Sequence, residues 1–212
     1  MKKNAAILLL FLAALVSCNQ KKQVAESKTT TTTDTATATA VPDKATDSAA
    51  IRKTIVDFYN WYDKNYMLLN NYHLYASIKK KNAPPYKINW DEVERYHQFL
   101  RLNIPQLGEE FVMNQKRFFK ECDSAFKLDT EGDIPYGFDY DWYTNSQEEP
   151  SYLLKQVNKS KPWGLNWSGE YVLVDVKGNY DNNGKKEDET LVTLTMKKEG
   201  EEWKIAKIGT DN

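Results

Sequence analysis

Cysteine and histidine are scarce, since the 212-residue sequence contains two of each. The two imidazoles, His73 and His97, are too few for a histidine-rich zinc site. Blocks of basic residues are also absent and the formal net charge is −1 at pH 7, which argues against nucleic acid as a partner and against polybasic attachment to lipid headgroups. The sequence has neither a glycine-rich phosphate loop nor a serine elbow motif. A Ser/His/Asp or Cys/His arrangement stays open, because such residues meet only in three dimensions.

The uncharged run from Ala5 to Ser17 follows Lys2 and Lys3. A membrane-spanning helix needs about 20 apolar residues, so this shorter run has the pattern of a signal peptide instead. The four residues Leu15-Val16-Ser17-Cys18 resemble the lipobox of bacterial lipoproteins, in which a branched residue and small residues precede an invariant cysteine. The resemblance implies that residues 1–17 are removed and that Cys18 carries diacylglycerol and an acyl chain such as palmitate.

Lipid on Cys18 would fix the location of the protein. Each buried methylene contributes about 0.8 kcal/mol of membrane affinity, so a multiply acylated cysteine is a permanent anchor. Asn19 follows the cysteine in place of aspartate, which resembles lipoproteins sent to an outer membrane. We therefore expect a bacterial envelope lipoprotein at the outer membrane. Loss of Lys2 and Lys3 with the signal peptide takes the net charge from −1 to −3.

Residues 18–46 are predicted to be the lipidated cysteine and a disordered tether. They are rich in threonine and alanine and contain no aromatic residue, so they cannot bury enough apolar area to offset chain entropy. The remainder, residues 47–212, has the size of a single α+β domain. With Cys18 lipidated, Cys122 is its only thiol, which excludes an intramolecular disulfide. Aromatic residues, 13% of the sequence, are expected to supply the core.

Apolar residues at helical spacing predict three main helices before residue 127. The first covers about residues 51–70, with Asp47 or Ser48 as its N-cap. The second follows Asn89 and the third covers about residues 107–126. A short helical piece is expected around residues 152–157.

Alternating apolar residues predict three strands in the last part of the sequence, at residues 172–176, 191–196 and 203–208. Turns at residues 181–184 and 199–200 would join them as an antiparallel meander. Helices first and a meander last indicate an α+β fold with N-terminal helices packed on one face of a sheet.

Cys122 and His97 fall on the apolar stripes of the predicted helices. Cys122 is expected to be a buried packing residue, because a reactive thiol needs an electropositive, partly exposed setting. His97 is expected to be a hydrogen-bonded core histidine, and His73 to be exposed in a polar turn. Trp203, on the last strand, is expected in the core.

The segment DTEGDIPYGFDYDWYTNSQEE, from Asp129 to Glu149, is acidic and aromatic. Its carboxylates are hard oxygen ligands of the kind that calcium prefers. Their spacing does not follow an EF-hand loop, so we predict no metal site and no cofactor. The carboxylates concerned are those of Asp129, Glu131, Asp133, Asp139 and Asp141.

Rings and carboxylates alternate in the second half of this segment. Rings beside carboxylates can stack on sugar faces or surround a cationic ligand, and Trp142 is expected to serve such recognition more than the core. Two alternatives stay open: a loop pinned by aromatic packing over the mouth of the core, and a pair of carboxylates with separated pKa values acting as acid and base. The candidate ligand- or partner-binding residues are Tyr136, Asp139, Tyr140, Asp141, Trp142, Gln147 and Glu148.

Three stretches are similar to a bacterial lipoprotein family called domain of unknown function 3828. They are IVDFYNWYDKNY at residues 55–66, DWYTNSQE at residues 141–148, and VTLTMKKEGEEWKIAKI at residues 192–208. In that family an aspartate precedes a glutamine and an acid at the spacing that Asp141, Gln147 and Glu148 keep here. The resemblance implies a nuclear transport factor 2-like (cystatin-like) fold, in which helices wrap a curved, cone-shaped antiparallel sheet and leave a pocket at its wide end.

These features predict a noncatalytic envelope lipoprotein that binds a small ligand or an envelope protein through the aromatic-acidic segment. One alternative is a small isomerase or hydrolase with Asp139, Asp141 or Glu148 as the base. Another is an inhibitor or immunity-type protein that occupies the cleft of an envelope enzyme. A pocket on a buried carboxylate would favour the enzyme, and a shallow exposed aromatic patch would favour a partner surface. A homodimer is compatible with the sequence.

Overall fold

The structure, a computed structural model, describes residues 44–79, 83–129, 134–147, 149–159, 161–182 and 185–209. The predicted signal peptide, Cys18 and the tether up to residue 43 lie outside the described residues, as do Glu131, Asp133 and Glu148. No helix in the described ranges is long and apolar enough to cross a membrane.

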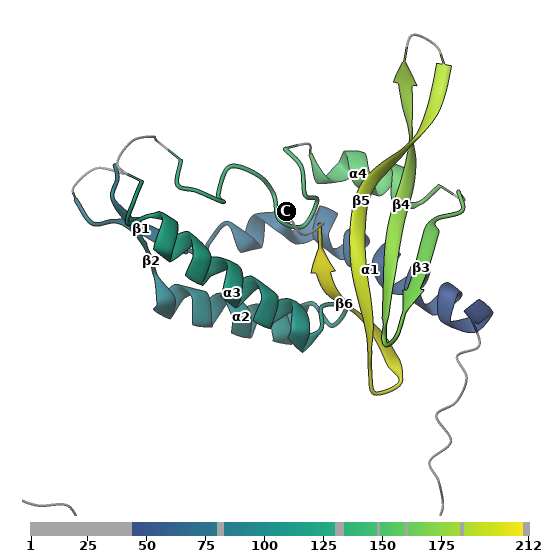
Figure 1. The fold of residues 1–212 in the computed structure, drawn as a ribbon, viewed down its shortest axis with the longest axis horizontal. Coiled ribbons are helices and arrows are strands. Elements are labelled where there is room, and N and C mark those ends of the chain that lie inside the picture. Colours follow the sequence, from purple (N-terminus) through teal and green to yellow (C-terminus); the bar gives the residue numbers. More distant parts are fainter. Residues whose placement is uncertain are drawn as a thin grey trace, which may run out of the picture. The chain divides into compact units, whose positions relative to one another are not determined.

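Four helices, a curved four-stranded antiparallel sheet and a separate two-stranded sheet make up the described residues (Figure 1). This confirms the predicted α+β class. In chain order the elements are α1 (Lys44–Leu69), β1 (Tyr75–Ser77), β2 (Tyr86–Ile88), α2 (Trp90–Asn103), α3 (Glu109–Ala125), α4 (Pro150–Val157), β3 (Gly164–Ser168), β4 (Tyr171–Asn182), β5 (Lys185–Glu199) and β6 (Glu202–Ile208).

The first helix, α1, begins before both predicted N-caps. Asp47 lies inside the helix and is buried, and its Oδ1 accepts hydrogen bonds from Trp203 Nε1 at 2.7 Å and from Lys198 Nζ at 3.2 Å. The predicted N-cap is therefore wrong, because this carboxylate joins α1 to the last two strands instead of capping the helix. The apolar stripe is confirmed, since Ile51, Ile55 and Phe58 are fully buried.

The main sheet is an antiparallel meander in the order β3-β4-β5-β6. Val172, Val174 and Val176 alternate along β4 and are fully buried, and Leu194 and Met196 continue the same face on β5. The three predicted strands are therefore confirmed. β3 and the β1–β2 pair were not predicted, because strands of five and three residues are too short to show alternation.

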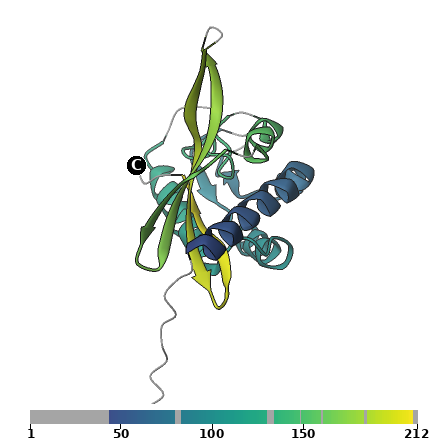
Figure 2. The ribbon, with the colours of Figure 1, turned by 90° about the vertical axis from the view of Figure 1, so that its right-hand side faces the viewer.

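The β4–β5 hairpin extends well beyond the other strands (Figure 1). β3 pairs with residues 171–175 of β4 and β6 pairs with residues 194–199 of β5, whereas the hairpin pairing continues to Asn182 and Lys185. The outer part of the hairpin is therefore a two-stranded arm. Figure 2 shows this arm at the top of the view. In the same view α1 and α4 lie on one side of the sheet.

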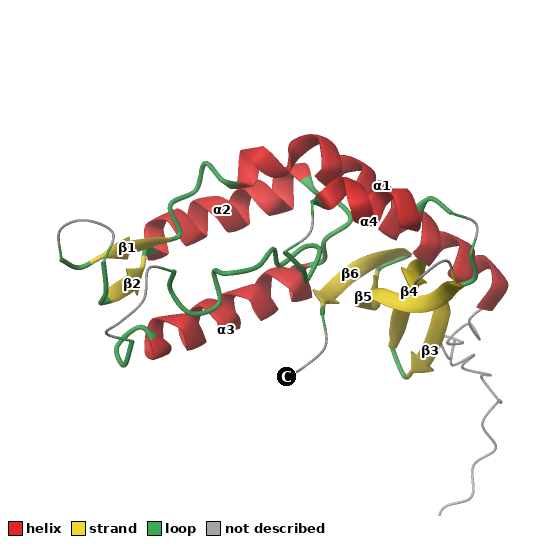
Figure 3. Cartoon of the chain, turned by 90° about the horizontal axis from the view of Figure 1, so that it is seen from above, coloured by secondary structure: helices red, strands yellow, loops and turns green. Residues whose placement is uncertain are grey.

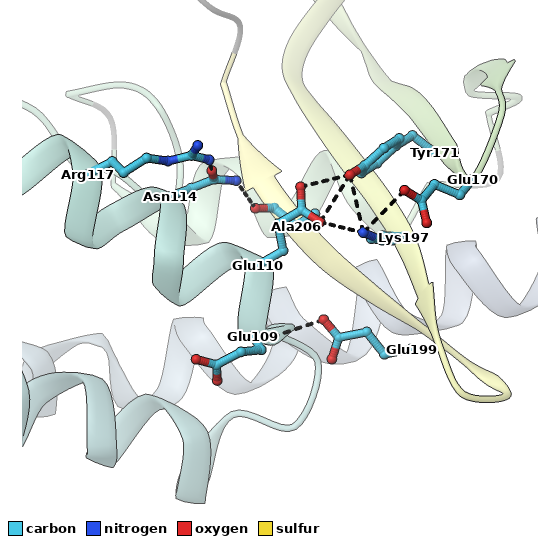
Figure 4. A network of polar contacts seen from close by, with 9 residues as sticks. All are labelled: Glu109, Glu110, Asn114, Arg117, Glu170, Tyr171, Lys197, Glu199 and Ala206. Atoms are coloured by element: carbon cyan, nitrogen blue, oxygen red, sulfur yellow. Dashed lines mark hydrogen bonds and ion pairs between the residues drawn. The ribbon is translucent and has the colours of Figure 1, made fainter. Parts of the chain in front are cut away.

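Hydrogen bonds hold the N-terminal end of α3 on the sheet. The backbone on either side of Leu107 pairs with Ile205, with N–O distances of 2.8 and 2.9 Å, so this segment covers the edge of β6. Glu110 binds Lys197 at 2.9 Å and accepts a hydrogen bond from the Tyr171 hydroxyl (Figure 4). Asn114 Nδ2 donates to the carbonyl of Ala206 at 2.9 Å (Figure 4).

From this attachment, α2 and α3 extend away from the sheet to the small β1–β2 sheet, and the connection from α3 to α4 returns along α3 toward the main sheet (Figures 1 and 3). This returning connection contains residues 134–147, which carry most of the predicted binding residues.

Candidate functional site

Asp141 closes a tight turn in the returning loop. Its backbone N–H donates to the carbonyl of Ser146 at 3.0 Å, and its Oδ1 accepts the N–H groups of Tyr143 at 2.7 Å and Thr144 at 3.3 Å. Asn145 completes the turn with a φ of 51°, a left-handed conformation that asparagine tolerates better than most residues. The first role of the Asp141 carboxylate is therefore to shape this turn.

The second oxygen of Asp141 contacts α1. Asp141 Oδ2 accepts a hydrogen bond from the hydroxyl of Tyr62 at 2.7 Å. Burial and the negative charge of Asp141 raise the pKa of Tyr62 far above its ordinary value. The Tyr62 hydroxyl therefore stays protonated and remains a donor to the carboxylate.

Tyr143 fixes the turn to two helices. Its carbonyl accepts the hydroxyl of Tyr59 at 2.9 Å, and its own hydroxyl is hydrogen bonded to that of Tyr96. Burial raises the pKa of Tyr59, Tyr96 and Tyr143 well above the ordinary value. These buried hydroxyls are neutral hydrogen-bonding groups over the whole physiological pH range.

Trp142 is packed more firmly than the sequence suggested. Its ring lies edge-on to Phe138 at 5.0 Å, Phe119 at 5.3 Å and Phe118 at 5.9 Å between centroids. Its Nε1 donates to the carbonyl of Gly137 at 2.8 Å. Trp142 is half-buried and its ring holds the loop against α3. This side chain therefore has a packing role, which the sequence analysis gave as an alternative to recognition.

Gly137 is required by this packing. Its φ is 78°, and an added Cβ would lie 2.6 Å from the Phe118 ring and 3.0 Å from Cys122 Sγ. Only glycine adopts this backbone conformation without strain and leaves room for both neighbours.

A cleft of about 920 Å3 opens between this loop, the second half of α1, the chain that follows α1, and α2. Half of the described residues that line it are aromatic, which is why we call it the aromatic cleft; they include Tyr62, Tyr66, Tyr75, Tyr96, Phe138 and Trp142. None of the described residues that line it belongs to β3, β4, β5 or β6. The described lining therefore comes from helices, loops and the small β1–β2 sheet, not from the main sheet.

Five of the predicted binding residues line the aromatic cleft: Asp139, Tyr140, Asp141, Trp142 and Gln147. Tyr136 belongs to the same loop and is 57% exposed, but it does not line the cleft. Glu148 lies outside the described residues.

Sequence reasoning missed the opposite wall. Tyr66 and Tyr72 come from the end of α1 and the chain after it, and Tyr75 begins β1. The stretch NNYHLY at residues 70–75 is the signal that could have found this wall, since it is unusually aromatic for a turn. His73 is exposed, as predicted, and it too lines the cleft.

The charge of the cleft is negative. Asp139, Asp141 and Glu149 line it together with His73, and no lysine or arginine among the described residues does. No lysine or arginine in the part of the chain that the structure describes forms an ion pair with any of these three carboxylates. The aromatic cleft therefore disfavours anions.

Cys122 and His97 lie outside the cleft. Cys122 is fully buried and burial raises the pKa of its thiol to about 12, which confirms a packing role. His97 is 1% exposed and burial lowers its pKa to about 4, so it is a neutral core histidine. Its Nε2 has no hydrogen-bond partner among the described residues, so the predicted hydrogen bond is not seen at this atom. The described ranges contain no group of three or more His, Cys, Asp or Glu residues that could hold a metal ion.

Comparison of the chain with protein-family models, with curated proteins and with solved structures gives no match.

Proposed function

We propose that this protein is an outer-membrane lipoprotein whose domain binds a small ligand in the aromatic cleft without transforming it. The observation that carries the proposal is the cleft itself, about 920 Å3 in volume, with aromatic rings on half of its described lining residues and three carboxylates that form no ion pair with a described lysine or arginine. Ligand sites are concave and mostly apolar, with a few polar groups that fix orientation, and the volume lies within their usual range.

Binding is better supported than catalysis. The Asp141 carboxylate accepts three hydrogen bonds that shape the turn and hold Tyr62, so removal of a proton from a ligand would compete with this structural role. Neither Cys122 nor His97 lines the cleft, so a Cys/His pair has no support there.

We also propose that the chain belongs to the family of domain of unknown function 3828 and has a nuclear transport factor 2-like fold. The aromatic helix α1 and the C-terminal meander support this assignment. Two of the loop residues that match the family pattern, Asp141 and Gln147, also support it, because both form hydrogen bonds within the loop. Asp141 shapes the turn, and Gln147 Nε2 donates to the carbonyl of Asp139 at 3.2 Å. The position of the cleft among helices differs from the sheet-mouth pocket that the resemblance implied.

The lipid anchor is tested in cells. We expect the protein to incorporate a palmitate analogue and to sediment with outer membranes, and Cys18→Ala to lose both properties. Labelling of the Cys18→Ala protein would contradict the anchor, because the palmitate analogue would then be attached to a residue other than Cys18.

Ligand binding is tested by native mass spectrometry of the mature protein in detergent, mixed with a small-molecule extract of cell envelopes. We expect one retained species on the wild type. Tyr140→Ala should lose it, because Tyr140 lines the cleft and is 38% exposed. Tyr136→Ala is the matched control, since it removes an exposed tyrosine from the same loop outside the cleft. Equal retention by both variants, or no species on the wild type, would contradict the proposal.

A further inference from the structure

The aromatic cleft has rings on both sides of a carboxylate. On one side Tyr62 lies between Tyr143, at a centroid distance of 4.9 Å, and Tyr66, at 6.1 Å. Tyr62 also holds Asp141 through its hydroxyl. This side is therefore a row of rings that ends at a negative charge, with Tyr62 and Tyr143 buried and Tyr66 partly exposed.

The other side is a second row of rings. Phe138 lies between Tyr75, at 4.7 Å, and Trp142, at 5.0 Å. Trp142 and Tyr143 follow Asp141 directly in the sequence, so the two rows meet at this carboxylate. Tyr62 and Tyr143 are buried and Tyr75 is 36% exposed, so a ligand in the cleft meets the outer rings of the two rows first.

No described lysine or arginine forms a cation–π pair with a ring that lines the cleft. In the described residues the cation–π pairs are Arg52 with Trp163, Lys197 with Tyr171, and Lys198 with Trp203. None of these rings lines the cleft. Carboxylates elsewhere have cationic partners, as Glu110 has in Lys197, whereas Asp139, Asp141 and Glu149 have none among the described lysines and arginines.

Hydrogen-bond donors deep in the cleft are already used. The Tyr62 hydroxyl donates to Asp141, and the Trp142 indole donates to Gly137. The hydroxyls of Tyr96 and Tyr143 are bonded to one another. An anion would need such donors, whereas partly exposed rings and carboxylate oxygens remain for a cation.

We propose that the ligand of the aromatic cleft is a small organic cation, an ammonium group that carries alkyl substituents. The inference rests on the proposed function and adds the chemical class of the ligand. Rings of this kind attract alkylammonium groups through their negative faces. The carboxylates Asp139 and Glu149 at the exposed part of the cleft add long-range attraction that salt reduces.

The probes are choline and its neutral isostere 3,3-dimethylbutan-1-ol, in which a tert-butyl group replaces the trimethylammonium group. The two compounds differ in charge but have nearly the same shape. Each is titrated into the mature protein in detergent by isothermal calorimetry at low salt. We expect choline to bind at least about tenfold more tightly than the isostere, the factor that a desolvated cation–π contact supplies. Equal affinity of the two probes would overturn the cationic class.

The double variant Asp139→Asn, Glu149→Gln removes two charges of the cleft and leaves the Asp141 turn intact. It should weaken choline by at least about fivefold and leave the isostere unchanged, while Asp91→Asn, an exposed charge at the start of α2, should change neither. Equal weakening by Asp91→Asn would overturn a role for the cleft charges.

The two proposals fail in different ways. If neither probe binds while native mass spectrometry finds an envelope species that Tyr140→Ala loses, the cationic class is wrong and the binding function stands. If native mass spectrometry also finds no species on the wild type, both proposals are wrong.

Discussion

The carboxylate of Asp141 accepts a hydrogen bond of 2.7 Å from the hydroxyl of Tyr62, and so joins the middle of α1 to a turn 79 residues further along the chain. The same carboxylate caps the backbone of that turn. One side chain therefore determines both the shape of the loop and its position against α1, which together form the aromatic cleft.

Tyr62→Phe should lower the free energy of unfolding by about 2 kcal/mol, because a buried hydrogen bond to an ionised carboxylate is lost. Urea unfolding followed by circular dichroism measures the change. Tyr66→Phe is the control, since the Tyr66 hydroxyl, on the same helix, makes no hydrogen bond to a described residue; it should change stability by less than about 0.5 kcal/mol. Equal effects of the two variants would contradict the role of the Tyr62–Asp141 bond.

Trp203→Ala should lower the free energy of unfolding by about 3 to 5 kcal/mol, because it removes a ring that is 7% exposed and also the partner of Asp47. Trp203→Phe keeps most of the packing and loses only the indole hydrogen bond, so its cost should be smaller. A denaturation midpoint that Trp203→Ala leaves unchanged would show that α1 is not held to β6 in this way.

His97 makes stability depend on pH. Burial lowers its pKa to about 4, whereas an unfolded histidine titrates near 6.5. Between these values the unfolded state binds more protons, so this contribution to stability is complete above about pH 6.5 and is lost as the pH falls toward 4. Glu94 opposes the shift, and Arg101 and Lys116 reinforce it.

His97→Leu should therefore flatten the dependence of the unfolding free energy on pH between about 4 and 6.5. The slope is the relevant quantity, since the substitution also changes packing against Phe119. A His97→Leu slope equal to that of the wild type would mean that His97 titrates normally in the folded protein.

Cys122 should resist thiol reagents in the native protein. Its side chain is fully buried and burial raises the pKa of the thiol to about 12, so almost no thiolate is present at pH 8. In mature protein, whose Cys18 thiol carries the proposed lipid, labelling by a disulfide reagent is expected only after denaturation and with one label per chain. Rapid labelling of folded protein would show that the loop around Gly137 opens readily.

Periodicity in the sequence was sufficient for the main elements, because Ile51, Ile55 and Phe58 repeat at helical spacing and Val172 and Val174 alternate as in a strand. Residues whose role depends on a distant partner were harder to predict. Asp47 is of a residue type and at a position typical of an N-cap. In the structure, however, its carboxylate is buried and accepts hydrogen bonds from Trp203 and Lys198.

The candidate site shows the same division. The loop residues Asp139 to Trp142 stood out by composition, and they line the cleft. The facing wall, with Tyr66 and Tyr75, became visible only in three dimensions, because α1 and the returning loop are far apart in the sequence. Packing of Trp142 on Phe118 and Phe119 could not be predicted either, since helical stripes do not show which loop covers them.

Binding in the aromatic cleft is tested most directly by nuclear magnetic resonance of the tryptophan indole N–H groups during titration with the envelope extract. The sequence has six tryptophans, all within the described residues, and only Trp142 lines the cleft. We predict that the Trp142 signal moves progressively while those of Trp163 and Trp203 stay in place. A Trp142 signal that does not move, or equal movement of all three, would contradict a ligand site at this position.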